Sequence, residues 1–340
     1  MENRKYETKA IVEAGIISAI IVVLMLIVGY IPVISIFGNF ILPVPVAILY
    51  LRHNLKTAIS AIVVSGTITA MLYNPISAIS MAISFGITGL ILGYSIKRDK
   101  KVIFTITVLT ITTLVGCIAN FYMTAFFISK TSFSGLITQT IDQLNTAMKT
   151  SADSIKAMYV KIGVTKEQLS QLDVFMKMLN VDAVLKMLGA VLIMSAAFSS
   201  YLNYIISTSI LKKFKYNIRS LKPFTQWYID NYVLLPLICI ALVGMILAGN
   251  GFKISQYILP SVLLLMQYSL MIDGWATVSY YLKNKFKLPN AVIVLIIIFT
   301  SMTQLGMLYM FIGIFDIAID PRKLNPRIQK YRDLKNTNQH

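Results

Sequence analysis

The chain has 340 residues, of which 56% are hydrophobic and only 13% are charged, and its mean hydropathy is +0.72. Soluble globular chains carry about 45–50% apolar and about 25% charged residues, so the charges here are too few to cover a water-facing surface. The composition excludes a soluble enzyme, and the apolar and aromatic content excludes a disordered chain. It predicts an all-α, polytopic transmembrane helical bundle.

Nine apolar runs approach or exceed the roughly 20 helical residues that cross a bilayer core. They cover residues 11–31, 34–51, 57–73, 75–94, 102–128, 183–211, 232–248, 255–281 and 291–317. The first run is too long for the apolar part of a signal peptide, contains Glu13 and precedes no A-x-A cleavage pattern. We therefore expect it to be retained as the first membrane helix.

Basic residues predict the orientation, because cytoplasmic loops are enriched in Lys and Arg. With a cytoplasmic N-terminus, the loops on that side hold seventeen basic residues and the short outer turns hold only Lys253. A ninth full span would place the tail, residues 319–340, on the outer side. The tail is rich in Lys and Arg, which belong on the cytoplasmic side. Polar Ser301, Thr303 and Gln304 interrupt the last run, so a bent or hairpin segment would return the tail to the cytoplasm. We expect about eight or nine spans in a plasma membrane.

One long hydrophilic stretch lies between the fifth and sixth runs, on the outer side in this topology. Apolar residues recur at helical steps from Leu136 to Met148, Gly163 breaks the pattern, and Thr165 with Gln168 forms a capping box for a second helix. We expect an amphipathic hairpin, either a structured lid or a binding surface. The predicted segments are a five-helix membrane bundle (1–128), the hairpin (129–182), the C-terminal membrane helices (183–318) and the basic tail (319–340).

The net charge of +17 does not indicate nucleic acid, because no basic stripe is interleaved with exposed aromatic residues. Cys117 and Cys239 lie in apolar runs without CxxC spacing, and His53 and His340 are too far apart to suggest a metal site. HExxH, GxSxG and P-loop patterns are absent. We therefore expect no enzyme activity, no cofactor and no metal.

Small residues at four-residue spacing mark one face of the first helix: Ala10, Ala14 and Ser18. Such a face lets another helix approach closely. The residues alone leave two alternatives open, which are docking of a partner subunit and packing within the bundle.

Two acidic residues lie within the apolar runs and are candidate intramembrane charges, because such groups are costly there unless they have a role. Glu13 lies one turn inside the first helix, where Lys9 is expected to pair with it. Asp273 lies deeper and no partner for it is visible in the sequence. Asp316 and Asp320 share a helix face beside Arg322, and a local ion pair with it is expected for them rather than acid–base catalysis.

Polar groups at mid or outer membrane depth are candidate solute ligands, or else hydrogen bonds between helices. They are Asn39, Asn74, Asn120 and Asn203. Asn39 precedes Pro43 and Pro45, and prolines free backbone carbonyls in membrane helices. A helix broken there would line a substrate site, and a bent structural helix is the alternative.

Several segments resemble the YybS-like family of bacterial membrane proteins, which is itself similar to the substrate-binding S components of energy-coupling-factor (ECF) transporters. They are TKAIVEAGIISAI (8–20), LPVPVAILYLRHNLKTA (42–58), GVTKEQLSQL (163–172), LKPFTQW (221–227) and GIFDIAIDPRK (313–323). The resemblance implies an S-component-like N-terminal half whose first helix docks through Ala10 and Ala14 onto an ECF coupling subunit that works with ATPases. S components have about six spans, so the additional helices and the hairpin depart from that pattern.

Two functions follow as hypotheses. In the first, the chain is an S-component-like subunit of an ECF-type transporter in a bacterial plasma membrane, and it binds a small solute. In the second, it is a non-transport scaffold that binds an envelope or cell-division partner through the outer hairpin.

Overall fold

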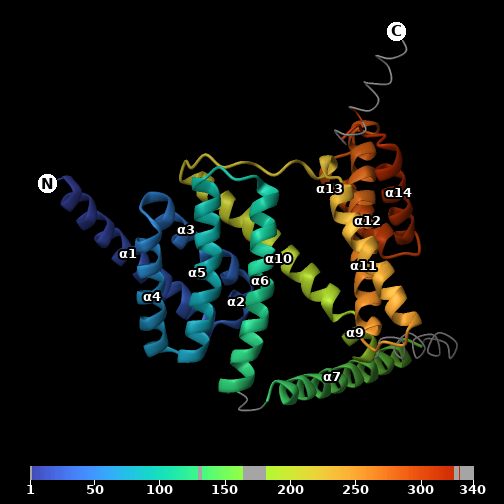
Figure 1. Cartoon of the computed structure of the whole chain (residues 1–340), viewed down its shortest axis with the longest axis horizontal. Coiled ribbons are helices and arrows are strands. Elements are labelled where there is room, and N and C mark those ends of the chain that lie inside the picture. The colour runs from blue at the N-terminus through green and yellow to red at the C-terminus, as the bar shows by residue number, and fades with distance from the viewer. Residues whose placement is uncertain (1, 129–131, 164–180, 325–328, 330–340) are drawn as a thin grey trace, which may run out of the picture. The chain divides into compact units, whose positions relative to one another are not determined.

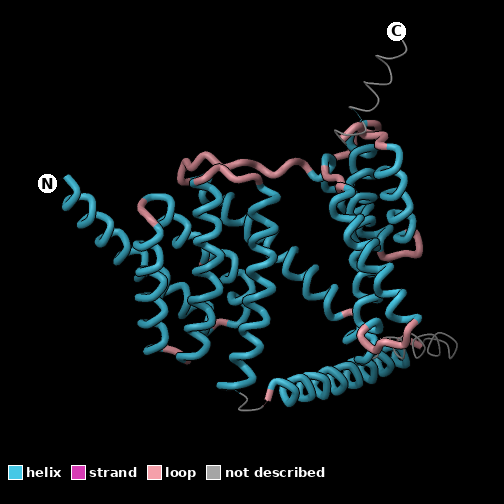
Figure 2. Tube along the Cα trace, viewed as in Figure 1, coloured by secondary structure: helices cyan, strands magenta, loops and turns pink. Residues whose placement is uncertain are grey.

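The computed structural model describes residues 2–128, 132–163, 181–324 and 329, and within these ranges the regular structure is helical (Figures 1 and 2). The helices of the N-terminal part, in chain order, are α1 (Glu2–Tyr30), α2 (Pro32–Ile41), α3 (Pro43–Arg52), α4 (Leu55–Leu72), α5 (Pro75–Lys97), α6 (Val102–Met123), the π-helical η1 (Thr124–Ile128) and α7 (Phe133–Lys161). They are followed by α9 (Val181–Lys186), α10 (Leu188–Lys213), η2 (Phe224–Gln226), α11 (Asn231–Gly249), α12 (Ser255–Asn284), α13 (Asn290–Ser301) and α14 (Gly306–Ile319).

Eight helices in these ranges are long and apolar enough to cross a membrane, and each coincides with one of the first eight predicted runs. The ninth run is broken into α13 and α14, which meet at 112°. The break falls at residues 302–305, so the predicted bent segment is confirmed. The second run is interrupted at Leu42, between α2 and α3, but it is counted as a single span.

The chain forms two compact units, which divide it differently from the predicted segments. Unit 1 comprises Met1–Leu172 and Leu192–Ser220, and unit 2 comprises Asp173–Val191 and Leu221–His340. Most of α10 therefore belongs with the N-terminal helices. Of the predicted hairpin, the first helix is α7, which ends at Lys161 before Gly163 at φ 79°. The predicted second helix lies outside the described residues.

The core of unit 1 is formed by α1, α3, α4 and α5. Ile21 and Met25 of α1 and Val46 and Leu49 of α3 are fully buried in it. Local signals in the sequence set the helix starts: the Asn54 side chain accepts from the backbone N–H of Thr57 to cap α4. Asn74 caps α5 in the same way and Pro75 follows it, and both features favour the first turn of a helix.

In unit 2, α12 and α14 pack at backbone-to-backbone distance, through a glycine on each helix. A Cβ atom at Gly274 would lie 1.9 Å from the carbonyl oxygen of Tyr309, and one at Gly313 would lie 2.1 Å from that of Leu270. Any larger residue would force the helices apart. The Trp275 and Tyr309 rings meet edge-on beside this contact, with centroids 6.4 Å apart.

The close contact predicts that Gly274→Ala destabilises the protein. Inserting one methyl group into a closed contact costs about 1–3 kcal/mol of unfolding free energy. Thermal unfolding of the purified chain in detergent would measure the loss. The matched control is Gly116→Ala in α6, where a Cβ would meet nothing within 4 Å. Equal stability of the two variants would contradict the tight α12–α14 contact.

Candidate functional site

The most deeply buried charges of unit 2 lie where α12, α14 and the segment that leads into α11 meet. The side chains of Arg322 and Asp273 are 0% exposed and that of Asp316 is 3% exposed. Asp320 ends α14 in a left-handed conformation, at φ 48° and ψ 57°. This turn reverses the chain, so that Arg322 folds back against the helix that precedes it.

Arg322 holds both carboxylates. Its Nε donates to Asp316 Oδ1 at 2.9 Å and its Nη2 donates to Asp316 Oδ2 at 2.6 Å, in the two-pronged geometry that suits a guanidinium. The same Nη2 donates to Asp273 Oδ1 at 3.1 Å. The predicted local pair of Arg322 with Asp316 is confirmed, and the partner that Asp273 lacked in the sequence is Arg322.

The cluster also fixes the irregular segment before α11. Arg322 Nη1 donates to the carbonyl oxygens of Trp227 at 2.8 Å and Thr225 at 3.2 Å. The backbone N–H of Ile229 donates to Asp273 Oδ1 at 3.0 Å. Five donor–acceptor contacts of one guanidinium therefore join two helices to a stretch that has only one short helical turn, η2.

Two carboxylates share one guanidinium here, so the cluster carries one excess negative charge when both are ionised. Asp273 Oδ2 is buried and has no hydrogen-bond partner in the part of the chain that the structure describes. Ionisable groups within membrane helices commonly mark pathways for ions or substrates. The arrangement can hold the segment before α11 in place, and Asp273 Oδ2 can accept one proton or face a small cation.

A second cluster lies in unit 1 around Glu13. Its carboxylate pairs with Arg52 at the end of α3 and accepts from His53 Nε2 at 2.8 Å. Arg52 Nε also donates to the Tyr216 hydroxyl at 3.3 Å. The predicted Lys9 pair is wrong for the described residues, because the turn that ends α3 brings Arg52 and His53 to Glu13 instead. Those partners are about forty residues away in the sequence, so helix spacing could not identify them.

The predicted docking residues of α1 differ in their exposure. Ala10 is 6% exposed and Ser18 is 4% exposed, whereas Ala14 is partly buried against the core. The opposite side of α1 is open and it also carries small residues, Gly15 and Ala19. A Cβ at Gly15 would meet nothing within 4 Å.

The four predicted solute-binding asparagines are not gathered at one place. Asn39 is exposed on α2, Asn74 is occupied as the cap of α5, and Asn120 donates to Ser80. Asn203 is buried on α10, and its Oδ1 has no partner among the described residues. Ser207, one turn further along α10, is also buried with a hydroxyl that lacks a described partner. The sequence did not single out this neighbour of Asn203.

Removing the guanidinium of Arg322 should strongly destabilise unit 2. Arg322→Met leaves two carboxylates buried without a counter-charge, and breaking a buried pair in this way costs about 3–5 kcal/mol. The triple variant Arg322→Met, Asp273→Asn, Asp316→Asn removes all three charges, so it should recover part of that loss. Thermal unfolding in detergent measures the stability of both variants. If Arg322→Met alone is as stable as the wild type, Arg322 has no central role in unit 2.

Comparison with known proteins places this chain among integral membrane proteins. The sequence model of a family described as predicted membrane protein (DUF2232) matches residues 19–317. The chain is similar to the uncharacterized protein YybS of Bacillus subtilis (strain 168), at 23% identity over 294 residues that cover 86% of this chain and 90% of the relative. No solved structure matches. The chain therefore belongs to the DUF2232 family of predicted membrane proteins.

Proposed function

We propose that this chain is a membrane subunit that takes up a small solute together with an ATP-driven module, in the manner of an S component. The likeness to S components rests on the sequence resemblance alone. The observation that carries the proposal is the composition of the open side of α1, which would dock onto the partner.

This open side is the strip Ile11, Gly15, Ala19 and Val23, whose members follow one another at four-residue steps. Ile11 is 72% exposed and Val23 is 56% exposed. Glycine inside a helix costs about 1 kcal/mol relative to alanine. Nothing in the described chain approaches Gly15, so packing within this chain gives no reason for it. A helix of another protein that packs closely over Gly15 and Ala19 gives one.

The proposal therefore moves the docking face from the side of Ala10 and Ser18 to the side of Gly15 and Ala19. Ala10 and Ser18 are nearly inaccessible, and the Ser18 hydroxyl donates to the Ala61 carbonyl of α4 at 3.5 Å, the long end of the hydrogen-bond range. Packing within the bundle accounts for these two residues. Ala14 lies between Ala10 and Ser18 on the same side of the helix and packs, partly buried, against the core.

For the solute, Asn203 and Ser207 are the best-placed ligands in unit 1. Both carry buried oxygen atoms without a described partner, and such groups normally find a partner in the protein, in water or in a ligand. Asn39, Asn74 and Asn120 have no comparable buried and unpartnered oxygen in the described structure.

A scaffold function is the second candidate, because α7 presents an apolar strip that the described chain does not cover. Ile155, Met158, Tyr159 and Ile162 follow helical spacing, with exposed fractions between 37% and 65%. Such a strip binds a membrane surface or a partner helix. The apolar strip supports the scaffold function only if it binds an envelope protein.

We expect the tagged wild-type protein, purified from its host in mild detergent, to retain a coupling membrane protein and an ATPase. Gly15→Trp should abolish this retention, because the indole ring prevents close helix approach at the open side of α1. The control is Val63→Trp on α4, a position that is 60% exposed and lies away from α1's open strip. It should retain the partners.

Two outcomes would reject the transport proposal. One is the absence of an ATPase from the wild-type preparation, and the other is equal retention by Gly15→Trp and the wild type. If an envelope protein is retained instead and is lost when residues 131–179 are deleted, the scaffold function replaces it.

A further inference from the structure

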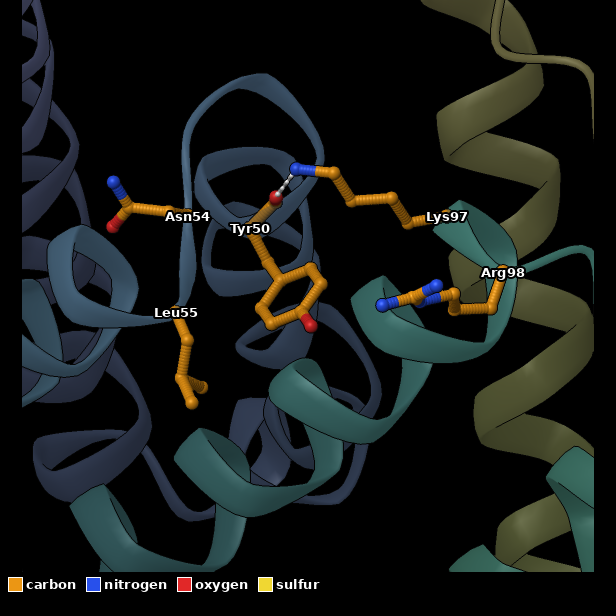
Figure 3. A pocket seen from close by; sticks show the side chains of 5 residues that line it. All are labelled: Tyr50, Asn54, Leu55, Lys97 and Arg98. Carbon is orange, nitrogen blue, oxygen red and sulfur yellow. Dashed lines mark hydrogen bonds between the residues drawn. The ribbon is translucent and has the colours of Figure 1, made fainter.

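A recess of about 350 Å³ lies in unit 1 where α3 and α5 end (Figure 3). It plays no part in the docking proposal and stands independently of it. In Figure 3 the Tyr50 ring lies between Leu55 on one side and two basic side chains on the other, and its hydroxyl points toward Arg98. The lining residues are Tyr50, Asn54, Leu55, Lys97 and Arg98.

Lys97 is hydrogen-bonded to backbone carbonyl oxygens at the wall of the recess. Its Nζ donates to the carbonyl oxygen of His53 at 2.8 Å and to that of Tyr50 at 3.2 Å, and it lies 5.5 Å from the centre of the Tyr50 ring. These carbonyls end α3, where backbone acceptors lack partners within the helix. An ammonium group has three donors, so one N–H of Lys97 remains for a ligand.

The other polar groups of the recess keep most of their donors free. The Arg98 side chain makes no hydrogen bond or ion pair with any part of the chain that the structure describes, so its five N–H donors are available. The Tyr50 hydroxyl has no described partner either. Asn54 uses its Oδ1 to cap α4, which leaves its amide N–H groups unengaged.

The acidic residues that could neutralise this charge are paired elsewhere. Glu13 pairs with Arg52 and His53. Asp99, next to Arg98 in sequence, accepts from Arg219 Nε at 2.7 Å, and this hydrogen bond lowers the pKa of Asp99 below its ordinary value. Asp99 therefore remains ionised and committed to Arg219, and among the described residues no acidic side chain lines the recess.

We propose that the recess binds a phosphate group. Basic residues at the end of a helix also complement its dipole, but here two cations and a phenol hydroxyl line one hollow in which the described residues place no acid. Arginine and lysine are the residues that bind phosphate oxygens, the former in a planar fork. Two candidate spans, those that contain α3 and α5, end beside the recess, which places it at the depth of lipid headgroups. The phosphate belongs either to an anionic phospholipid or to a soluble phosphate compound.

The test uses the full chain, purified in a neutral detergent. Native mass spectrometry would compare retention of dioleoylphosphatidylglycerol with that of dioleoylphosphatidylcholine, and calorimetry would measure binding of inorganic phosphate. Arg98→Gln should weaken binding by about tenfold, because a hydrogen bond to a charged group is worth at least that factor. Tyr50→Phe should cause a smaller loss. The matched control is Lys101→Gln, which removes the same charge three residues away, outside the lining of the recess.

If phosphatidylglycerol is retained selectively, and Arg98→Gln weakens this retention while Lys101→Gln does not, the ligand is a lipid headgroup. Binding of inorganic phosphate with the same dependence on Arg98 would identify a soluble phosphate compound. Equal effects of Arg98→Gln and Lys101→Gln would overturn the proposal, because they would reveal attraction by general surface charge. Binding of neither probe to the wild type would overturn it as well. The Arg98 side chain makes no described contact, so its replacement should leave the elution profile of the protein unchanged.

Discussion

Unit 2 depends on the burial of one guanidinium. Arg322 is shared between two carboxylates and two backbone carbonyl groups, and it is fully removed from solvent. The cost of taking such charges out of water is several kcal/mol for each ion, and it is offset only when the geometry satisfies every donor. The left-handed turn at Asp320, the glycine contact of α12 with α14 and the position of residues 225–229 all bring those acceptors into place. Loss of the turn or of the close contact would leave the same charges buried and unmatched.

In unit 1 the described charges form separate ion pairs instead of one buried cluster. Of the described acidic side chains near its membrane ends, Glu13 is paired with Arg52 and Asp99 with Arg219, and both bases are distant in the sequence. Because basic residues outnumber acidic ones by 31 to 14 in the chain, pairing leaves an excess of cations. Where that excess lies on a loop, it is the feature from which the orientation of the chain was predicted. Where it converges on a hollow, as with Lys97 and Arg98, it becomes available to an anion.

The hydropathy pattern predicted the spans and the broken ninth run because both depend on composition within one segment. The asparagine caps of α4 and α5 have the same local origin. The partners of Asp273 and Glu13 were not predictable, since they come from residues 49 and about 40 positions away and depend on how helices are rotated against each other. The same rotation separates the small residues of α1 into a buried set with Ala10 and Ser18 and an open set with Gly15 and Ala19. Spacing alone indicates a face of a helix but not which face is covered.

In unit 1, the Glu13 cluster and the recess are linked through His53. Its imidazole bonds to Glu13 of α1, its backbone carbonyl accepts from Lys97, and Lys97 forms one wall of the recess. A helix that docks on the open strip of α1 would press on the helix that carries Glu13, within one turn of Gly15. Any shift of α1 along its axis would stretch the Glu13–His53 hydrogen bond and would move the residue that positions Lys97. The proposed docking on α1 and the proposed binding in the recess would therefore act on one continuous chain of contacts, a physical route by which each would alter the free energy of the other.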